Sequence, residues 1–100
     1  MSLTRPLEEA IRVLGDRAVE HGNHVELHQR IADLWSAYLV TWIKPHQVAA
    51  MLALMKLARS ESNPSNDDNV VDFCGYGAIM GDLLKIGSHR ASLRGVEEDL

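Results

Sequence analysis

The sequence predicts an all-α protein built as a four-helix antiparallel bundle. Three observations lead to this class: apolar residues recur every three or four positions in four successive segments, capping residues or prolines open these segments, and turn-rich stretches separate them. Short connections favour antiparallel neighbours in a helical protein. The sequence shows neither an alternation of strand and helix patterns nor a glycine-rich phosphate-binding fingerprint, which are typical of α/β nucleotide-binding folds.

The first predicted helix covers about residues 5–20. Thr4 offers a capping hydroxyl, and Pro6 suits a first helical turn because its missing N–H would have no partner there. Its predicted buried stripe comprises Leu7, Ile11, Leu14 and Ala18.

The second predicted helix covers residues 24–39. Asn23 can cap it, and Glu26 follows three residues later at the spacing of a capping box. Its predicted buried face comprises Leu27, Ile31, Leu34, Trp35 and Tyr38.

The third predicted helix begins at Pro45, after a connector of five residues, and ends near Arg59. Residues 60–66 are rich in Ser, Asn and Pro, so they form the next loop. The predicted buried stripe of this helix comprises Val48, Met51, Leu52, Met55 and Ala58.

The fourth predicted helix opens at Asn66 or Asp67, and Gly87 is a natural place for it to end. Three glycines inside it disfavour the helix by about 2–3 kcal/mol in total. We therefore expect a compensating close contact with another helix or with a ligand. These glycines are Gly75, Gly77 and Gly81.

The length and composition indicate one small domain. One hundred residues with 46% hydrophobic content can form a core, and a net charge of −4 argues against a general nucleic-acid binder. We expect residues 1–87 to form the helical domain and residues 88–100 to form a poorly ordered tail or one short helix. A domain this small has a thin stability margin, so a homodimer is expected.

The compartment can be predicted from two features. The single cysteine, Cys74, fits a reducing cytosol and excludes a disulfide scaffold. The N-terminus lacks the apolar segment of a signal peptide, and no apolar run approaches the roughly 20 residues needed to span a bilayer. The expected location is the cytoplasm, with no membrane association.

Two carboxylates on the fourth predicted helix form the main candidate site. Asp68 and Asp72 lie four residues apart, so both point to the same side of the helix and could hold Mg²⁺ near phosphate groups. Alternatively, Asp68 caps the helix and Asp72 pairs with Arg59 or Arg17. Asp72 is the more unusual of the two, because it lies between Val71 and Phe73 and needs a partner there.

Basic residues near the predicted helix ends could bind phosphate. Lys56 and Arg59 close the third helix, where they could hold phosphate oxygens or complement the negative end of the helix dipole. Arg17, next to Asp16, is either part of an ion pair or an arm of the site. Three histidines could bind zinc, although their short spacing is a weak motif and an exposed polar edge is the favoured explanation: His21, His24 and His28.

Two sequence blocks resemble a family of small phage proteins of unknown function whose members are often described as MazG-like nucleotide pyrophosphohydrolases. The blocks are Leu-Trp-Ser-Ala-Tyr-Leu at residues 34–39 and Asp-Asn-x-x-Asp-x-x-Gly-Tyr at residues 68–76. The resemblance extends over about residues 7–80. The second block is also similar to phage nucleotide-modification-associated domains, which share an Asp-x-x-x-Asp-x-x-x-Tyr helix.

The resemblance implies an all-α, usually dimeric enzyme that cleaves nucleoside triphosphates between the α and β phosphates with Mg²⁺. It implies that Asp68 and Asp72 hold the metal. The implied nucleotide and phosphate ligands are Arg17, Lys56, Arg59, Asn69 and Tyr76. The first metal motif of such enzymes, Glu-x-x-Glu, has no counterpart here, since the second helix offers only Glu26 and Asp33, seven residues apart.

Two functions therefore follow from the sequence. The first is a phage-encoded, MazG-like nucleotide-binding protein or Mg²⁺-dependent pyrophosphohydrolase. The second is a non-catalytic phage protein that binds and modulates a host protein, because the metal motif is incomplete and Trp42 and Ile43 place large apolar side chains in a connector.

Overall fold

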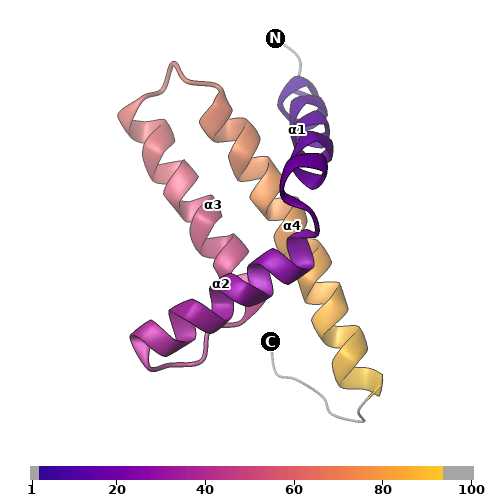
Figure 1. Ribbon diagram of the computed structural model, residues 1–100. Helices are drawn as coiled ribbons and strands as arrows, with labels where there is room; N and C mark the ends of the chain where they lie inside the picture. Colours follow the sequence, from indigo (N-terminus) through magenta and orange to yellow (C-terminus); the bar gives the residue numbers. More distant parts are fainter. Residues whose placement is uncertain (1–2, 94–100) are drawn as a thin grey trace.

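The protein is formed of four α-helices. The computed structural model describes residues 3–93, and the side chains of these residues except His21 and residues 88–93. Figure 1 shows α3 and α4 side by side, with α1 along α4 and α2 crossing obliquely. The predicted all-α, four-helix class is confirmed, and the described residues contain no strand. The helices are α1 (Arg5–His21), α2 (His24–Leu39), α3 (Pro45–Ser62) and α4 (Asp68–Leu93).

The corner between α1 and α2 is set by local chemistry. Gly22 ends α1 with a φ of 75°, which glycine adopts without strain, and its N–H donates to the carbonyl of Ala18 at 3.1 Å. The Asn23 side chain then accepts a hydrogen bond of 2.8 Å from the N–H of Val25, so the predicted cap of α2 is confirmed. Thr4 precedes α1 as predicted, but its side chain makes no capping hydrogen bond.

The turn between α3 and α4 is shorter than predicted, and both helices are longer. α3 begins at Pro45 as expected and continues to Ser62 instead of ending near Arg59. Asn66 accepts a hydrogen bond from the N–H of Asp68 at 3.0 Å and so satisfies one free donor at the start of α4.

The predicted end of α4 at Gly87 is wrong, because the helix continues through this residue to Leu93. A glycine stops a helix only where the backbone turns left-handed, and Gly87 keeps a negative φ. The last part of the predicted tail, residues 94–100, lies outside the described residues.

The helices pack on one another through small residues. Ala32 of α2 and both Val48 and Ala49 of α3 are fully buried. Ala49 joins Ile79 and Leu83 of α4 in the central cluster. Alanine lets two helix backbones approach closely, which explains why the α3–α4 contact is so extensive.

The predicted buried stripes were therefore partly wrong. On the first three helices the buried residues include alanines outside the predicted stripes, namely Ala10, Ala32, Ala49 and Ala53. Many large side chains remain exposed, because periodicity locates the apolar side of a helix but not the line along which another helix approaches. Ala58, from the predicted stripe of α3, and Ala18, from that of α1, are exposed as well. The exposed large members of the predicted stripes are Leu7, Ile11, Leu27, Leu34, Tyr38, Met51 and Met55.

The glycines of α4 do not mark a general close approach to another helix. A Cβ atom at Gly75 would meet the Leu14 side chain of α1 at 3.7 Å, which is ordinary contact. At Gly77 and Gly81 it would meet nothing within 4 Å among the described atoms. The expected compensation by close helix contact is therefore absent at two of the three positions. No helix in the described part of the chain is both long and apolar enough to cross a membrane.

Candidate functional site

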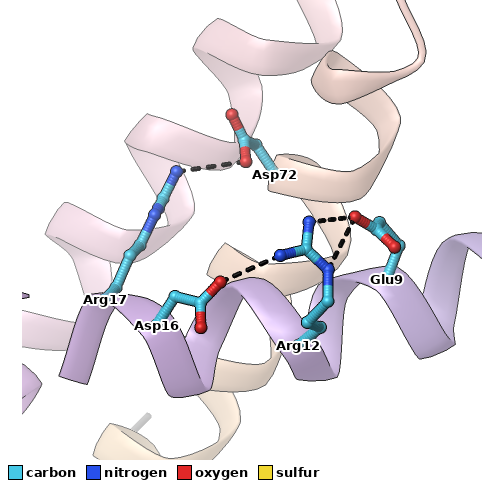
Figure 2. Close-up of polar contacts among 5 residues, drawn as sticks. All are labelled: Glu9, Arg12, Asp16, Arg17 and Asp72. Carbon is cyan, nitrogen blue, oxygen red and sulfur yellow. Dashed lines mark hydrogen bonds and ion pairs between the residues drawn. The ribbon is translucent and has the colours of Figure 1, made fainter. Parts of the chain in front are cut away.

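Asp72 joins three helices through two ion pairs. Its Oδ1 atom accepts from the Nη2 atom of Arg17 on α1 at 3.1 Å, and its Oδ2 atom lies 2.9 Å from the Nζ atom of Lys56 on α3. Figure 2 shows Arg17 extending from α1 towards Asp72 on α4. Of the two partners proposed for Asp72 from sequence, Arg17 is confirmed, and Lys56 is an additional one.

The burial of this cluster determines its electrostatics. The side chains of Asp72 and Lys56 are each 13% exposed, whereas that of Arg17 is 37% exposed. One carboxylate shared by two cations leaves a net charge of +1, which is carried at the more exposed end by Arg17. Burial of an unpaired carboxylate would be costly, and the two cations offset this cost.

Arg17 also contacts an aromatic ring. Its guanidinium carbon lies 5.7 Å from the centre of the Tyr76 ring, within the range of a cation–π interaction. Asp72 and Tyr76 therefore hold the guanidinium from two directions. By contrast, Arg12, one turn earlier on α1, pairs with Glu9 and Asp16 along the surface of its own helix, as Figure 2 shows.

A cavity of about 660 Å³ lies next to Arg17. It opens between α1, α2 and α4, and one α3 residue, Leu52, completes its wall. This volume falls within the range of small-molecule binding sites, and the wall combines apolar side chains with a few polar ones, as such sites do. The lining residues are Leu14, Arg17, Ala18, Gly22, His24, Leu27, His28, Ile31, Leu52, Tyr76, Ala78, Ile79 and Asp82.

Two histidines of α2 add polar groups to this cavity. The Nε2 atom of His24 lies 2.6 Å from Oδ2 of Asp82 on α4, in a half-exposed pair. His28 is buried, and its Nδ1 atom lies 2.8 Å from the backbone oxygen of His24. Burial lowers the pKa of His28; the hydrogen bond to the His24 carbonyl opposes this shift, and the neighbouring His24 side chain adds to it.

The structure brings together four of the seven predicted site residues: Arg17, Lys56, Asp72 and Tyr76. Arg59 and Asp68 have exposed side chains that make no ion pair with this cluster in the described structure. Asn69 is buried one turn before Asp72 on α4 and does not line the cavity.

Among the side chains that the structure describes, no three His, Cys, Asp or Glu residues are grouped so that they could hold a metal ion. Both oxygens of Asp72 already contact cations, and His24 and His28 each use one ring nitrogen within the protein. The side chain of His21, the third histidine of the zinc hypothesis, lies outside the described part.

Sequence reasoning missed the role of Asp82 and the burial of His28. A signal for Asp82 was present, because it is a carboxylate beside Leu83 in an apolar segment, the same argument that singled out Asp72. No local signal distinguishes His28 from His24, since its burial depends on where α2 crosses the other helices.

Comparisons with known proteins place the chain in one family. Residues 5–84 match the model of a domain of unknown function, DUF6378. The chain is 41% identical over 81 residues to the Gene 55 protein of Mycobacterium phage L5. The aligned segment covers 80% of this chain and 51% of that protein. It is 38% identical over 75 residues to the Gene 55 protein of Mycobacterium phage D29, and that alignment covers 74% of this chain and 50% of the relative.

The chain thus spans about half the length of the curated relatives it matches. No solved structure gives a significant match. The family match includes the three residues of the ion-pair cluster and every residue that lines the cavity. On this evidence the chain belongs to the DUF6378 family.

Proposed function

We propose that this protein binds a nucleotide in the cavity between α1, α2 and α4, with a phosphate group on Arg17. The observation that carries the proposal is the position of Arg17, which lines the cavity and is held by Asp72 and Tyr76. A guanidinium fixed in this way pairs with phosphate oxygens without losing much side-chain freedom. The net charge of +1 of the Arg17–Lys56–Asp72 cluster supports an anionic ligand.

The apolar wall of the cavity supports a base at the other end of the ligand. Leu27 and Ile31 of α2 and Ile79 of α4 present surface that suits a planar heterocycle. A phosphorylated nucleoside matches a site with one cationic and one apolar end. The expected setting is the cytoplasm of the phage's bacterial host, where such compounds are abundant.

In this proposal Mg²⁺ binds together with the nucleotide, not at a site of its own on the protein. The ion would arrive coordinated by phosphate oxygens, because both oxygens of Asp72 are engaged by Arg17 and Lys56. Pyrophosphohydrolase activity is the further step that the MazG-like resemblance suggests. It requires a water molecule activated at the α or β phosphate, and it is tested separately from binding.

Thermal denaturation with nucleoside mono-, di- and triphosphates, each with and without Mg²⁺, tests the binding. At a ligand concentration of 100 times Kd the free energy of unfolding rises by about 2.7 kcal/mol, which for a domain of this size raises Tm by about 10–20 °C. Arg17→Gln removes the shift, whereas Arg12→Gln on the same helix retains it. If no nucleotide shifts Tm, or if both variants behave alike, the proposal is wrong.

Turnover is measured on the same samples. Release of pyrophosphate from a triphosphate in the presence of Mg²⁺, lost in Arg17→Gln, supports an enzyme. A Tm shift with no product after long incubation supports a nucleotide-binding protein without hydrolytic activity.

A second candidate function, binding of a host protein, is favoured by the corner between α2 and α3. Tyr38, Val40 and Trp42 are 87%, 89% and 74% exposed there. Val40 has a φ of 52°, a left-handed conformation that is strained for a β-branched residue. Exposed apolar groups on a strained turn suit recognition by another protein.

Capture from a lysate of the host separates this candidate from self-association. Light scattering shows whether the exposed corner instead joins two copies of this chain, as the expected homodimer requires. Trp42→Ala abolishes specific capture if the corner binds a host protein, while Val19→Ala, an equally exposed apolar residue of α1, does not. Capture that is unchanged in Trp42→Ala would exclude this surface.

A further inference from the structure

The Nε2 atom of His28 is a buried hydrogen-bond acceptor with no partner in the described structure. The His28 side chain is only 3% exposed, and its Nε2 atom makes no hydrogen bond. Its Nδ1 atom faces the backbone oxygen of His24 at 2.8 Å. Because a carbonyl oxygen can only accept, Nδ1 must carry the hydrogen.

The protonation state of Nε2 follows from this contact. Burial favours the neutral imidazole, which has one N–H and one bare nitrogen. With the hydrogen on Nδ1, Nε2 is the bare nitrogen and can only accept. A buried acceptor without a donor is rare in folded proteins, and it often marks a place where a ligand or water completes the bond.

His28 is also one of the residues that line the cavity beside Arg17. On α2, the cavity-lining residues Leu27 and Ile31 beside it are apolar, and His24, one turn earlier, is paired with Asp82. This surrounding suits the plane of a base better than the hydroxyl groups of a sugar. A base that enters here would lie beside His28, whose Nε2 atom lacks a partner, whereas the other acceptor of this part of the wall, the Asp82 carboxylate, already pairs with His24.

We propose that His28 selects the base of the bound nucleotide by accepting a hydrogen bond at Nε2 from an exocyclic amino group. This inference rests on the proposed nucleotide binding and adds the recognition of one ligand group to it. An amino-bearing base satisfies the buried nitrogen, whereas a base without an N–H donor leaves it unpaired. Loss of such a bond changes affinity by about tenfold.

Calorimetric titration with two closely matched ligands tests the inference. Adenosine 5′-monophosphate carries the exocyclic amino group, and purine riboside 5′-monophosphate lacks it but has the same sugar, phosphate and ring. The wild-type protein binds the first about ten times more tightly. His28→Phe removes the acceptor and reduces the ratio to near one, whereas His28→Gln restores a preference because its amide oxygen accepts.

Two further measurements complete the test: a titration with a nucleotide that lacks the sugar hydroxyl groups, and nitrogen NMR of the free protein. The affinity of 2′,3′-dideoxyadenosine 5′-monophosphate equals that of the full nucleotide if the donor is on the base; a tenfold loss with this ligand assigns the donor to the sugar and overturns the proposal. Nitrogen NMR of the free protein shows His28 with a protonated Nδ1 and a bare Nε2. The opposite tautomer excludes the acceptor role whatever the ligand.

The two proposals fail in different ways. If no nucleotide binds at all, the proposed function is wrong and the selection by His28 falls with it. If both purine nucleotides bind with equal affinity and that binding is lost in Arg17→Gln, nucleotide binding stands and only the role of His28 is overturned.

Discussion

The two sides of helix α4 have very different surroundings. Towards α3 it meets a seam of small residues, in which Ala49 packs on Ile79 and Leu83 and the paired Asp72 is nearly buried. Towards α1 and α2 it borders a cavity of about 660 Å³, where Asp82 is half exposed and has one histidine partner.

The difference shows what each side of α4 contributes. The α3 side holds the fold together, so changes there should act on stability. The cavity side leaves space and polar groups without a full set of partners, so changes there should act on ligand binding and on the response to pH. Four substitutions test this division.

The largest expected effect is that of Asp72→Ala. Removing the carboxylate leaves Lys56 buried beside Arg17 with no counter-charge, and the free energy of unfolding falls by about 2–3 kcal/mol. This is less than the ~3–5 kcal/mol for a fully buried pair, because water screens the 37%-exposed Arg17. Urea denaturation measures the loss, and Asp68→Ala on the same helix, an exposed carboxylate, changes stability by less than about 0.5 kcal/mol.

Equal effects of Asp72→Ala and Asp68→Ala would contradict the structural importance of the ion-pair cluster. A second variant, Asp72→Asn, keeps the shape of the side chain and removes only its charge. A similar loss in this variant shows that the charge, rather than the packing, is responsible.

Ala49→Leu should give the next largest effect. Ala49 is fully buried against Ile79 and Leu83, so a larger side chain forces α3 away from α4. Overpacking of this kind costs about 1–3 kcal/mol. Ala58→Leu on the same helix serves as the control because Ala58 is exposed. If Ala49→Leu is as stable as the wild type, the seam is not closely packed.

The pH dependence of stability should come in part from His28. Because burial lowers its pKa, the unfolded chain binds more protons than the folded protein once the pH falls below the ordinary histidine value of 6.5. Stability therefore falls as the pH decreases from 7.5 towards 5.5, by no more than about 1.4 kcal/mol per pH unit for this one group.

His28→Gln removes this contribution, so its stability curve should be flatter than that of the wild type over the same range. Urea midpoints at several pH values measure both curves. His24→Gln is the comparison variant: the His24 side chain only adds to the shift that burial causes, so this change should flatten the curve less than His28→Gln does. A wild-type curve that is already flat would show that His28 is protonated without cost.

The sequence-based predictions succeeded where local chemistry decides the structure. Asn23 caps α2 through its own side chain, and Pro45 opens α3 because its ring fits only the first turn. The helix faces were predicted less well. Leu34 and Tyr38 look like core residues from their spacing, yet both are exposed, whereas Ala32 of the same helix is fully buried.

The candidate site was predictable to a similar degree. A carboxylate between Val71 and Phe73 needs a partner, so the sequence singles out Asp72, with Arg17 or Arg59 as the alternative partners. The sequence could not show that Lys56 would pair with the same carboxylate and so occupy the oxygens expected to bind Mg²⁺. The cavity depends on the crossing of α2, which no local pattern specifies, and the burial of His28 was missed for that reason.

The smallest expected effect belongs to Asp82→Asn on the cavity side. Its pair with His24 is half exposed, and such pairs contribute less than about 1 kcal/mol. The loss should also shrink as salt is raised from 0.05 to about 0.5 M, since ions screen an exposed pair more than a buried one. Urea denaturation at both salt concentrations, with Asp72→Asn measured beside it, compares the two borders of α4 directly. A salt-independent loss at Asp82 as large as that at Asp72 would mean that the cavity border is as firmly closed as the α3 seam.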